Sequence, residues 1–571
     1  MSDQEIYPNK YGELRSICKY YIDLYNALYQ LKTENEEGLK SIYQKIKTEL
    51  IDSKNHLPQT IIKDILNIIL YNNRYTKSYL FLAKLISGDY HVEEVREVEH
   101  VSNFLFYKEY GIKLDKSDDF EKFKSENLDI HTEDSIYRTI MYNDLERFIS
   151  FTEREAFDKN QKLRSHLYPS FTNYSLLELC CYHGAVDCFK LLRTKFNSEI
   201  TDTCLELSFL GGHPEIMNEC LKYQKPDEEC MEFAIISHNI DFVAFLMNEY
   251  NLEIKLIDCK IFNNLESFLV YFDKTNDIDE CFDNSIIYNI PSLCKYFISH
   301  GANINKKMSL QETAIHHAAE YNSKEAIELL ISHGANINEK DEYGATALHY
   351  AAKYNSKETV ELLISHGADI NEKDEYGATA LHYAAENNSK ETTELLISHG
   401  ANINEKDEYG ATALHYAAKY NSKETVELLI SHGANINEKD EHGATALHYA
   451  AKYNSKETVE LLISHGANIN EKDEHGATAL HYAAENNSKE TAELLISHGA
   501  DINEKDEYGA TALHYAAENN SKEITELLIS HGANINEKDD TGRSALDYAI
   551  ENDSKETAEL LSLHLHINDL Q

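Results

Sequence analysis

Histidine is the side chain with useful acid–base and metal-binding chemistry that recurs most regularly in this sequence. Imidazoles equivalent to His349 and His366 return every 33 residues through the second half of the chain. Imidazoles can transfer protons near neutral pH and are common zinc ligands. Side chains that are separated by the spacing of packed helices, roughly 8–10 Å, are too far apart to converge on one ion. We therefore expect structural histidines, no metal site and no cofactor.

The compact motifs of the common enzyme classes are absent from the sequence. It contains no Gly-x-x-x-x-Gly-Lys phosphate loop, no His-Glu-x-x-His pair, no Gly-x-Ser-x-Gly elbow and no kinase signature. Nine of the ten cysteines lie between Cys180 and Cys294, and none has Cys-x-x-Cys spacing. We expect buried, structural thiols. The sequence therefore predicts no catalytic residues and a protein that is not an enzyme.

The recurrent histidines belong to a 33-residue unit that occurs eight times between Met308 and Gln571. The peptide Thr-Ala-Leu-His-Tyr-Ala-Ala begins at Thr346, Thr379, Thr412, Thr445, Thr478 and Thr511. A unit this short cannot bury its own apolar face, so each copy must stack on the next. We number the copies 1 to 8 from Met308. The period predicts one elongated array with a continuous core.

One copy, Asp341 to Lys373, shows the local structure that is expected in all of them. Thr346 is a suitable N-cap for a short first helix, and Ser356 is a suitable N-cap for a second. Asn355 tolerates the left-handed backbone of the turn between them, and Gly367 is a typical left-handed helix stop. The remainder is polar and turn-rich. The copy should form two antiparallel helices followed by a projecting turn.

This unit resembles the ankyrin repeat. The matching residues are Asp341, Gly344, Thr346-Ala347-Leu348-His349, Ala351-Ala352, Leu362-Leu363 and Gly367-Ala368. The family usually has proline at the position of Ala347 and Gly-His at Asn355-Ser356. The resemblance implies an all-α solenoid of stacked helix-turn-helix repeats, with histidines that tie turns to helices. If those imidazoles are neutral and buried, mild acid should loosen the stack.

The first 307 residues are less regular, and we expect three regions in them. Apolar residues at helical spacing predict a helical N-terminal bundle over 1–120, and 121–169 is expected to be a linker and helical connection. Segments such as Ser175 to Gly184 resemble divergent ankyrin units, so degenerate ankyrin-like repeats are expected over 170–307. Eight regular repeats then fill 308–571. The whole arrangement resembles the large ankyrin families that are expanded in some parasitic protists.

The formal charge of -44 is spread along the array without an obvious basic face. An acidic surface repels phosphate, so nucleic acid is not an expected partner. The start of the sequence lacks a secretory pattern, and no segment is apolar enough to span a bilayer. We expect a cytoplasmic, monomeric protein that does not insert into membranes.

Ankyrin proteins, by resemblance, grip protein partners with their turn tips and the inner face of the first helix. Most differences between the interior copies fall at these positions. The predicted tip residues are Glu342, Tyr343, Glu375, Tyr376, Glu408, Tyr409, Glu441, His442, Glu474, His475, Glu507 and Tyr508. The predicted helix residues are Lys353, Tyr354, Glu386, Asn387, Lys419, Tyr420, Lys452 and Tyr453.

The sequence thus favours a non-enzymatic scaffold or adaptor that binds a protein partner along the concave face of the solenoid. Two alternatives stay open at this point. The near-identical copies could form a structural spacer or elastic rod without a specific partner. The chain could also be a substrate adaptor of a degradation or trafficking complex, with the N-terminal region as a second binding site.

Overall fold

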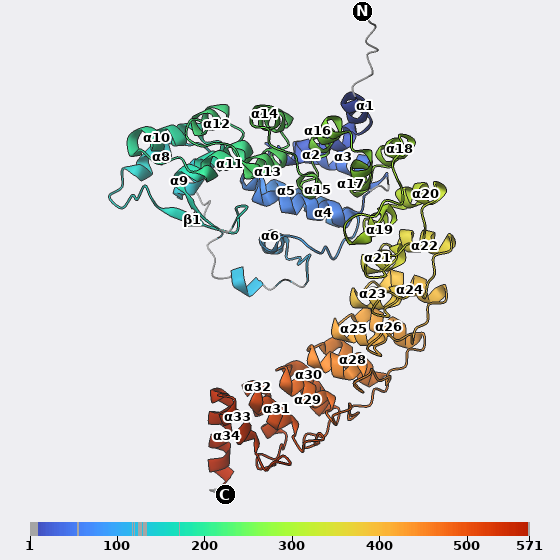
Figure 1. Cartoon of the computed structure of the whole chain (residues 1–571). Helices are drawn as coiled ribbons and strands as arrows, with labels where there is room; N and C mark the ends of the chain where they lie inside the picture. The colour runs from blue at the N-terminus through green and yellow to red at the C-terminus, as the bar shows by residue number, and fades with distance from the viewer. Residues whose placement is uncertain are drawn as a thin grey trace, which may run out of the picture. The chain divides into compact units, whose positions relative to one another are not determined.

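The computed structural model of the chain is mostly helical, which confirms the predicted fold class (Figure 1). The structure describes residues 10–53, 56–116, 118, 120–123, 128, 134–170 and 172–568. The chain divides into two compact units, Met1–Ala302, here called the N-terminal unit, and Asn303–Gln571, here called the repeat array.

Within its described residues, the repeat array consists of eight helix pairs that follow one another in sequence order (Figure 1). The first helices are α19 (Ala314–Glu320), α21 (Ala347–Lys353), α23 (Ala380–Glu386), α25 (Ala413–Lys419), α27 (Ala446–Lys452), α29 (Ala479–Glu485), α31 (Ala512–Glu518) and α33 (Ala545–Glu551). The second helices are α20 (Lys324–Ser332), α22 (Lys357–Ser365), α24 (Lys390–Ser398), α26 (Lys423–Ser431), α28 (Lys456–Ser464), α30 (Lys489–Ser497), α32 (Lys522–Ser530) and α34 (Lys555–Asn568). A short turn, η6 (Ser309–Gln311), precedes the first pair.

Each helix pair is bounded by the residues that the sequence indicates. The backbone amide of Thr346 donates to Nδ1 of His349 at 3.0 Å, which closes the first turn of α21. Asn355 has φ 53°, and Gly367 has φ 92°, so both predicted left-handed positions are confirmed. Leu348 and Ala351 are buried, and the first helices of neighbouring repeats contact one another. The core is therefore continuous along the array.

The predicted serine cap of the second helix is wrong. Ser356 occupies the N-cap position of α22, but its side chain makes no capping hydrogen bond. Its ψ of 70° lies outside the extended conformation that aims an N-cap hydroxyl at the first-turn amides. In the next three repeats the hydroxyls of Ser389, Ser422 and Ser455 are buried without a hydrogen-bond partner. In repeats 6 and 8 the equivalent hydroxyls of Ser488 and Ser554 donate instead to the carbonyls of Lys452 and Glu518 in the preceding repeat.

Asparagine at the turn between the helices has a second role, because it ties each repeat to the next. Oδ1 of Asn355 accepts a hydrogen bond from the hydroxyl of Thr392 at 2.8 Å, and its Nδ2 donates to Glu391 at 3.3 Å. Glycine, which the ankyrin family often has here, cannot make either bond. At the repeat 6–7 junction Ile524 replaces the threonine and offers no hydroxyl to Asn487.

Repeat 3 contains a buried hydroxyl that lowers its stability. Oγ1 of Thr393 is buried and has no hydrogen-bond partner, whereas repeats 2, 4 and 5 have Val360, Val426 and Val459 at the equivalent position. An unsatisfied buried hydroxyl costs about 1 kcal/mol or more. We expect Thr393→Val to raise the free energy of unfolding by about that amount, measured by urea denaturation. A stability that is unchanged or lower would contradict this assignment.

The N-terminal unit is also helical. It begins with α1 (Lys10–Ile17), α2 (Lys19–Tyr29), α3 (Glu36–Lys45), η1 (Ile46–Ile51), α4 (Pro58–Asn67), η2 (Ile68–Leu70), η3 (Asn73–Tyr75), α5 (Thr76–Asp89), α6 (His100–Tyr110), η4 (Phe120–Phe123), α7 (Ile136–Met141) and α8 (Leu145–Thr152). A two-stranded antiparallel ribbon, β1 (Lys162–Arg164) and β2 (Asn173–Ser175), follows. The predicted linker over 121–169 lies partly outside the described residues.

A series of helix pairs completes the N-terminal unit. Its helices are α9 (Leu176–His183), α10 (Val186–Phe196), α11 (Asp202–Gly211), α12 (Pro214–Cys220), α13 (Glu228–Ile236), α14 (Ile240–Tyr250), α15 (Leu256–Ile261), α16 (Leu265–Thr275), α17 (Ile278–Ser285), η5 (Ile286–Tyr288) and α18 (Pro291–Ser299). The first helices of the chain pack on this series, since Tyr21 donates to Asn263 at 3.0 Å and Gln30 donates to the His238 carbonyl at 2.7 Å. All ten cysteines are buried free thiols. No helix in the described residues is both long and apolar enough to cross a bilayer.

Candidate protein-binding face

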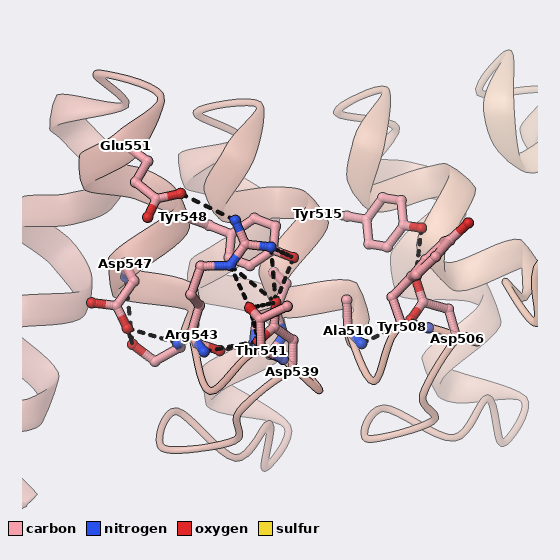
Figure 2. A network of polar contacts seen from close by, with 12 residues as sticks. Asp506, Tyr508, Ala510, Tyr515, Asp539, Thr541, Arg543, Asp547, Tyr548 and Glu551 are labelled. Carbon is pink, nitrogen blue, oxygen red and sulfur yellow. Dashed lines mark hydrogen bonds and ion pairs between the residues drawn. The ribbon is translucent and has the colours of Figure 1, made fainter.

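The projecting turn of each repeat is shaped by the aspartate that opens it. Oδ1 of Asp374 accepts hydrogen bonds from the amides of Tyr376 at 3.0 Å and Ala378 at 2.8 Å. Gly377 follows with φ 75°. This closed turn leaves the pair Glu375-Tyr376 at its tip. Figure 2 shows the equivalent turn of repeat 7, in which Asp506 lies beside Tyr508 and Ala510.

Adjacent tips are joined through their backbones. The amide of Glu375 donates to the carbonyl of Tyr343 at 2.8 Å, and the same bond recurs from repeat to repeat up to the amide of Asp540. The Lys340 ammonium also lies 2.6 Å from Glu372 of the next repeat, and this pair recurs along the array. The tips are therefore held in a fixed row before any partner arrives.

A tyrosine on the first helix of repeats 2 to 8 connects that helix to the turn. The Tyr383 hydroxyl donates to Oδ2 of Asp374 at 2.8 Å, and Figure 2 shows the matching contact of Tyr515 with Asp506 at 2.9 Å. Burial and the neighbouring carboxylate raise the pKa of Tyr383 well above its ordinary range. The hydroxyl stays protonated and continues to donate. The first helix and the tip thus form one rigid surface.

The repeated histidines support this surface from inside. Nδ1 of His349 accepts from the Thr346 amide, so the ring proton lies on Nε2, which donates to the Ala378 carbonyl of the next repeat at 3.3 Å. The ring also meets Tyr383 edge to face, with centroids 5.5 Å apart. Burial lowers the pKa of His349. Both nitrogens are engaged in the folded chain, which leaves neither one available as a ligand.

The predicted partner-binding residues lie where they are accessible. The tip tyrosines Tyr343, Tyr376, Tyr409 and Tyr508 are 41%, 43%, 53% and 59% exposed, and Tyr354, Tyr420 and Tyr453 on the helices are 41%, 45% and 47% exposed. Glu386, Asn387 and Lys419 are half-buried, and the other predicted residues are exposed. We call the surface of tips and first helices the tip–helix face. Its role in binding is still a prediction.

Some predicted residues are brought into direct contact. The Lys419 ammonium lies 4.9 Å from the ring centroid of Tyr420 and 5.6 Å from that of Tyr453 in the next repeat. Nδ1 of His442 lies 2.8 Å from Glu474, and His475 makes the same contact with Glu507 at 2.7 Å. These hydrogen bonds raise the pKa of both exposed histidines.

Repeat 8 has a different surface, which the sequence analysis missed. Arg543 replaces the alanine found at the equivalent position of repeats 2 to 7, and its guanidinium lies 3.0 Å from Asp539, 3.2 Å from Glu551 and 4.6 Å from the ring centroid of Tyr548 (Figure 2). Burial alone would raise the pKa of Asp539, but hydrogen bonds from Arg543, Thr541 and Tyr548 lower it overall. The polar groups of this repeat bind one another, so the tip–helix face ends here.

Comparison with family models agrees with this repeat architecture. A family model described as ankyrin repeats (3 copies) matches residues 285–374, 370–440, 437–506 and 503–570, and the chain belongs to the ankyrin-repeat family. A domain of unknown function, DUF3447, matches residues 196–271. Among solved structures, the human ASB11 ankyrin repeat domain is 29% identical, with a TM-score of 0.35, over 38% of this chain and 97% of that chain. No curated protein matches the chain.

Ankyrin repeats generally mediate protein–protein interactions, and the family is typically non-enzymatic. In the described residues, no group of three or more histidine, cysteine or acidic side chains is arranged to hold a metal ion. The tip–helix face offers rigid aromatic and charged side chains on a row of fixed turns. Such a surface is suited to recognition by contact.

Proposed function

We propose that this chain is a non-enzymatic interaction scaffold whose tip–helix face, from repeat 2 to repeat 7, binds a protein partner. The formal charge of -44 disfavours self-association, so we propose that it acts as a monomer. We also propose the cytoplasm as its location. The face is the same one that ankyrin proteins in general use, and here it is supported by the positions of the exposed tyrosines.

One observation carries the proposal. The described residues of the repeat array expose ten large apolar or aromatic side chains, and seven of them are tyrosines at the tip and helix positions of the tip–helix face. These rings are 41% to 59% exposed, so much of their contact area is left free for a partner. Tyrosine offers a large rigid contact area with a polar end and little loss of side-chain entropy, and it is common at interface hot spots.

The proposal is tested by replacing Tyr343, Tyr376 and Tyr409 together with alanine in the full chain. Each ring is exposed, so we expect a melting temperature close to that of the wild type. Loss of three central aromatic contacts, at about 2 kcal/mol each, should reduce partner retention more than a hundredfold. The measurement is quantitative crosslinking and mass spectrometry of retained proteins.

The matched control replaces Glu361, Glu394 and Glu427 with alanine. These side chains are exposed on the second helices at the same repeat spacing. A partner that is lost from the tyrosine variant and kept by this control supports the proposal. Equal retention by both variants would point to the N-terminal unit and the adaptor alternative, and no retained partner on the wild-type chain would favour the spacer.

A further inference from the structure

Repeats 2, 3 and 4 carry identical tips that differ from those of the next two repeats. Each of the three tips presents an exposed Glu-Tyr pair, namely Glu342-Tyr343, Glu375-Tyr376 and Glu408-Tyr409. In the described part of the chain these three carboxylates have no ion-pair partner, whereas Glu474 and Glu507 are paired with tip histidines. The first three tips therefore form a row of available negative charge.

Each carboxylate of this row is next in sequence to an exposed tyrosine, as in Glu342-Tyr343. A hydrogen bond with Glu342 is the main cause that raises the pKa of Tyr343, and the same pair recurs in repeats 3 and 4. A cation placed at a tip can meet the carboxylate and the face of the tyrosine ring together, and the two attractions add. The chemistry of each tip fits one lysine or arginine side chain.

The spacing of the tips selects the conformation of the partner. Adjacent repeats are separated by the distance between packed helices, roughly 8–10 Å. A polyproline II segment has three residues per turn and rises about 9 Å per turn, so every third side chain faces the same way at this interval. In a β-strand, side chains on one face recur about every 7 Å, which does not match the spacing of the tips.

We propose that the three Glu-Tyr tips of repeats 2 to 4 bind an extended basic segment of a partner protein, held as a polyproline II helix with lysine or arginine at every third residue. This inference rests on the proposed function and adds the chemistry and spacing of the ligand. The backbone bond from Glu375 to Tyr343 fixes the spacing before binding. A partner with the same period therefore loses little entropy when it docks.

The neighbouring helix residues make the three tips unequal. On the first helices of repeats 2, 3 and 4 the equivalent side chains are Lys353, Glu386 and Lys419. The first helix of repeat 3 thus carries an acidic side chain, where those of repeats 2 and 4 carry basic ones. The central basic residue of the segment should contribute most to binding, and Glu375→Gln should weaken binding more than Glu342→Gln.

The test is fluorescence anisotropy of labelled peptides with the full chain at low salt. The probe repeats the triplet Pro-Pro-Lys about five times, and a second peptide has the same composition with its lysines clustered. We expect the triplet peptide to bind about tenfold more tightly than the clustered one. Replacing Glu342, Glu375 and Glu408 with glutamine should weaken triplet binding about tenfold.

The control replaces Glu361, Glu394 and Glu427 with glutamine, which changes the net charge equally on the second helices. This variant should bind the triplet peptide within about twofold of the wild type. Equal binding of the two peptides, equal losses in the two variants, or no binding would overturn the inference. If the peptides fail while the triple tyrosine variant still loses its partner, the proposed function stands and only the ligand class is wrong.

Discussion

Acidification from about pH 7.5 to about pH 5 is expected to lower the melting temperature of the repeat array strongly. The cause is the row of buried imidazoles at His349 and the equivalent positions of repeats 1 to 7, whose pKa values are all lowered by burial. The complete row is His316, His349, His382, His415, His448, His481 and His514. Protonation at Nδ1 would break the hydrogen bond that each ring accepts from a threonine amide.

The sign of the effect follows from linkage. In the unfolded chain these histidines titrate near their ordinary pKa of about 6.5, and in the folded array they titrate lower. As the pH falls through about 6.5, the unfolded state binds protons first, so the free energy of unfolding decreases. Each histidine contributes up to about 1.4 kcal/mol per pH unit in this window. The stability that the neutral histidines contribute is fully present at pH values above their pKa in the unfolded chain.

Other groups of the repeat array with shifted pKa values do not reverse this loss of stability on acidification. The pKa values of the tip histidines His442 and His475 are raised, but both side chains are exposed and their ion pairs contribute little. The lowered pKa values of carboxylates such as Glu405 and Glu438 act at more acid pH.

Circular dichroism melting curves at the two pH values measure the loss of stability. A variant with His442→Gln and His475→Gln should keep the full acid sensitivity, and a melting temperature independent of pH over this range would contradict the account.

Gly377→Ala is expected to destabilise the array much more than Gly400→Ala, although both glycines belong to repeat 3 and have positive φ, 75° and 95°. A Cβ at Gly377 would lie 2.8 Å from the amide nitrogen of Glu408 and 3.1 Å from the carbonyl carbon of Asp407. Both atoms belong to the backbone of the next repeat and cannot move independently. Around Gly400 the added carbon meets nothing within 4 Å.

The two substitutions therefore separate backbone strain from loss of stacking. Left-handed strain alone should cost about 1–2 kcal/mol at Gly400, and the clash at Gly377 should raise the total to about 3–4 kcal/mol. Displacement of the turn would also stretch the bond between the Glu408 amide and the Tyr376 carbonyl. Urea denaturation of both variants measures the difference. Equal losses of stability would mean that the tips do not pack on one another as described.

The repeat fold could be predicted because local and periodic signals agree. Asn355 and Gly367 have the backbone angles that their residue types favour, and the apolar spacing marks the buried side of each helix. Ser356 was misjudged because residue preference alone does not fix ψ at an N-cap position. The hydrogen bond by which Asn355 joins two repeats could not be predicted from the sequence either. Its partner Thr392 is 37 residues away, and only the stacking of the repeats brings the two side chains together.

The candidate face was only partly accessible from sequence. Variation between copies pointed to the tip and helix positions, but it could not reveal Tyr383, because that residue is the same in nearly every copy. The different surface of repeat 8 was also not predicted, although the replacement of alanine by Arg543 is visible in the sequence. The contacts of Arg543 with Asp539, Tyr548 and Glu551 depend on side-chain geometry, which the sequence does not give.

The most direct test of the central claim places a photo-crosslinking amino acid at Tyr376 or, in a separate protein, at Glu394 of the full chain. The first position lies on a tip and the second on the exposed side of a second helix of the same repeat. After irradiation in the cell, crosslinked protein is quantified for both positions. We expect a discrete partner from position 376 and little product from position 394. Equal products, or a partner crosslinked only from position 394, would contradict recognition by the tip–helix face.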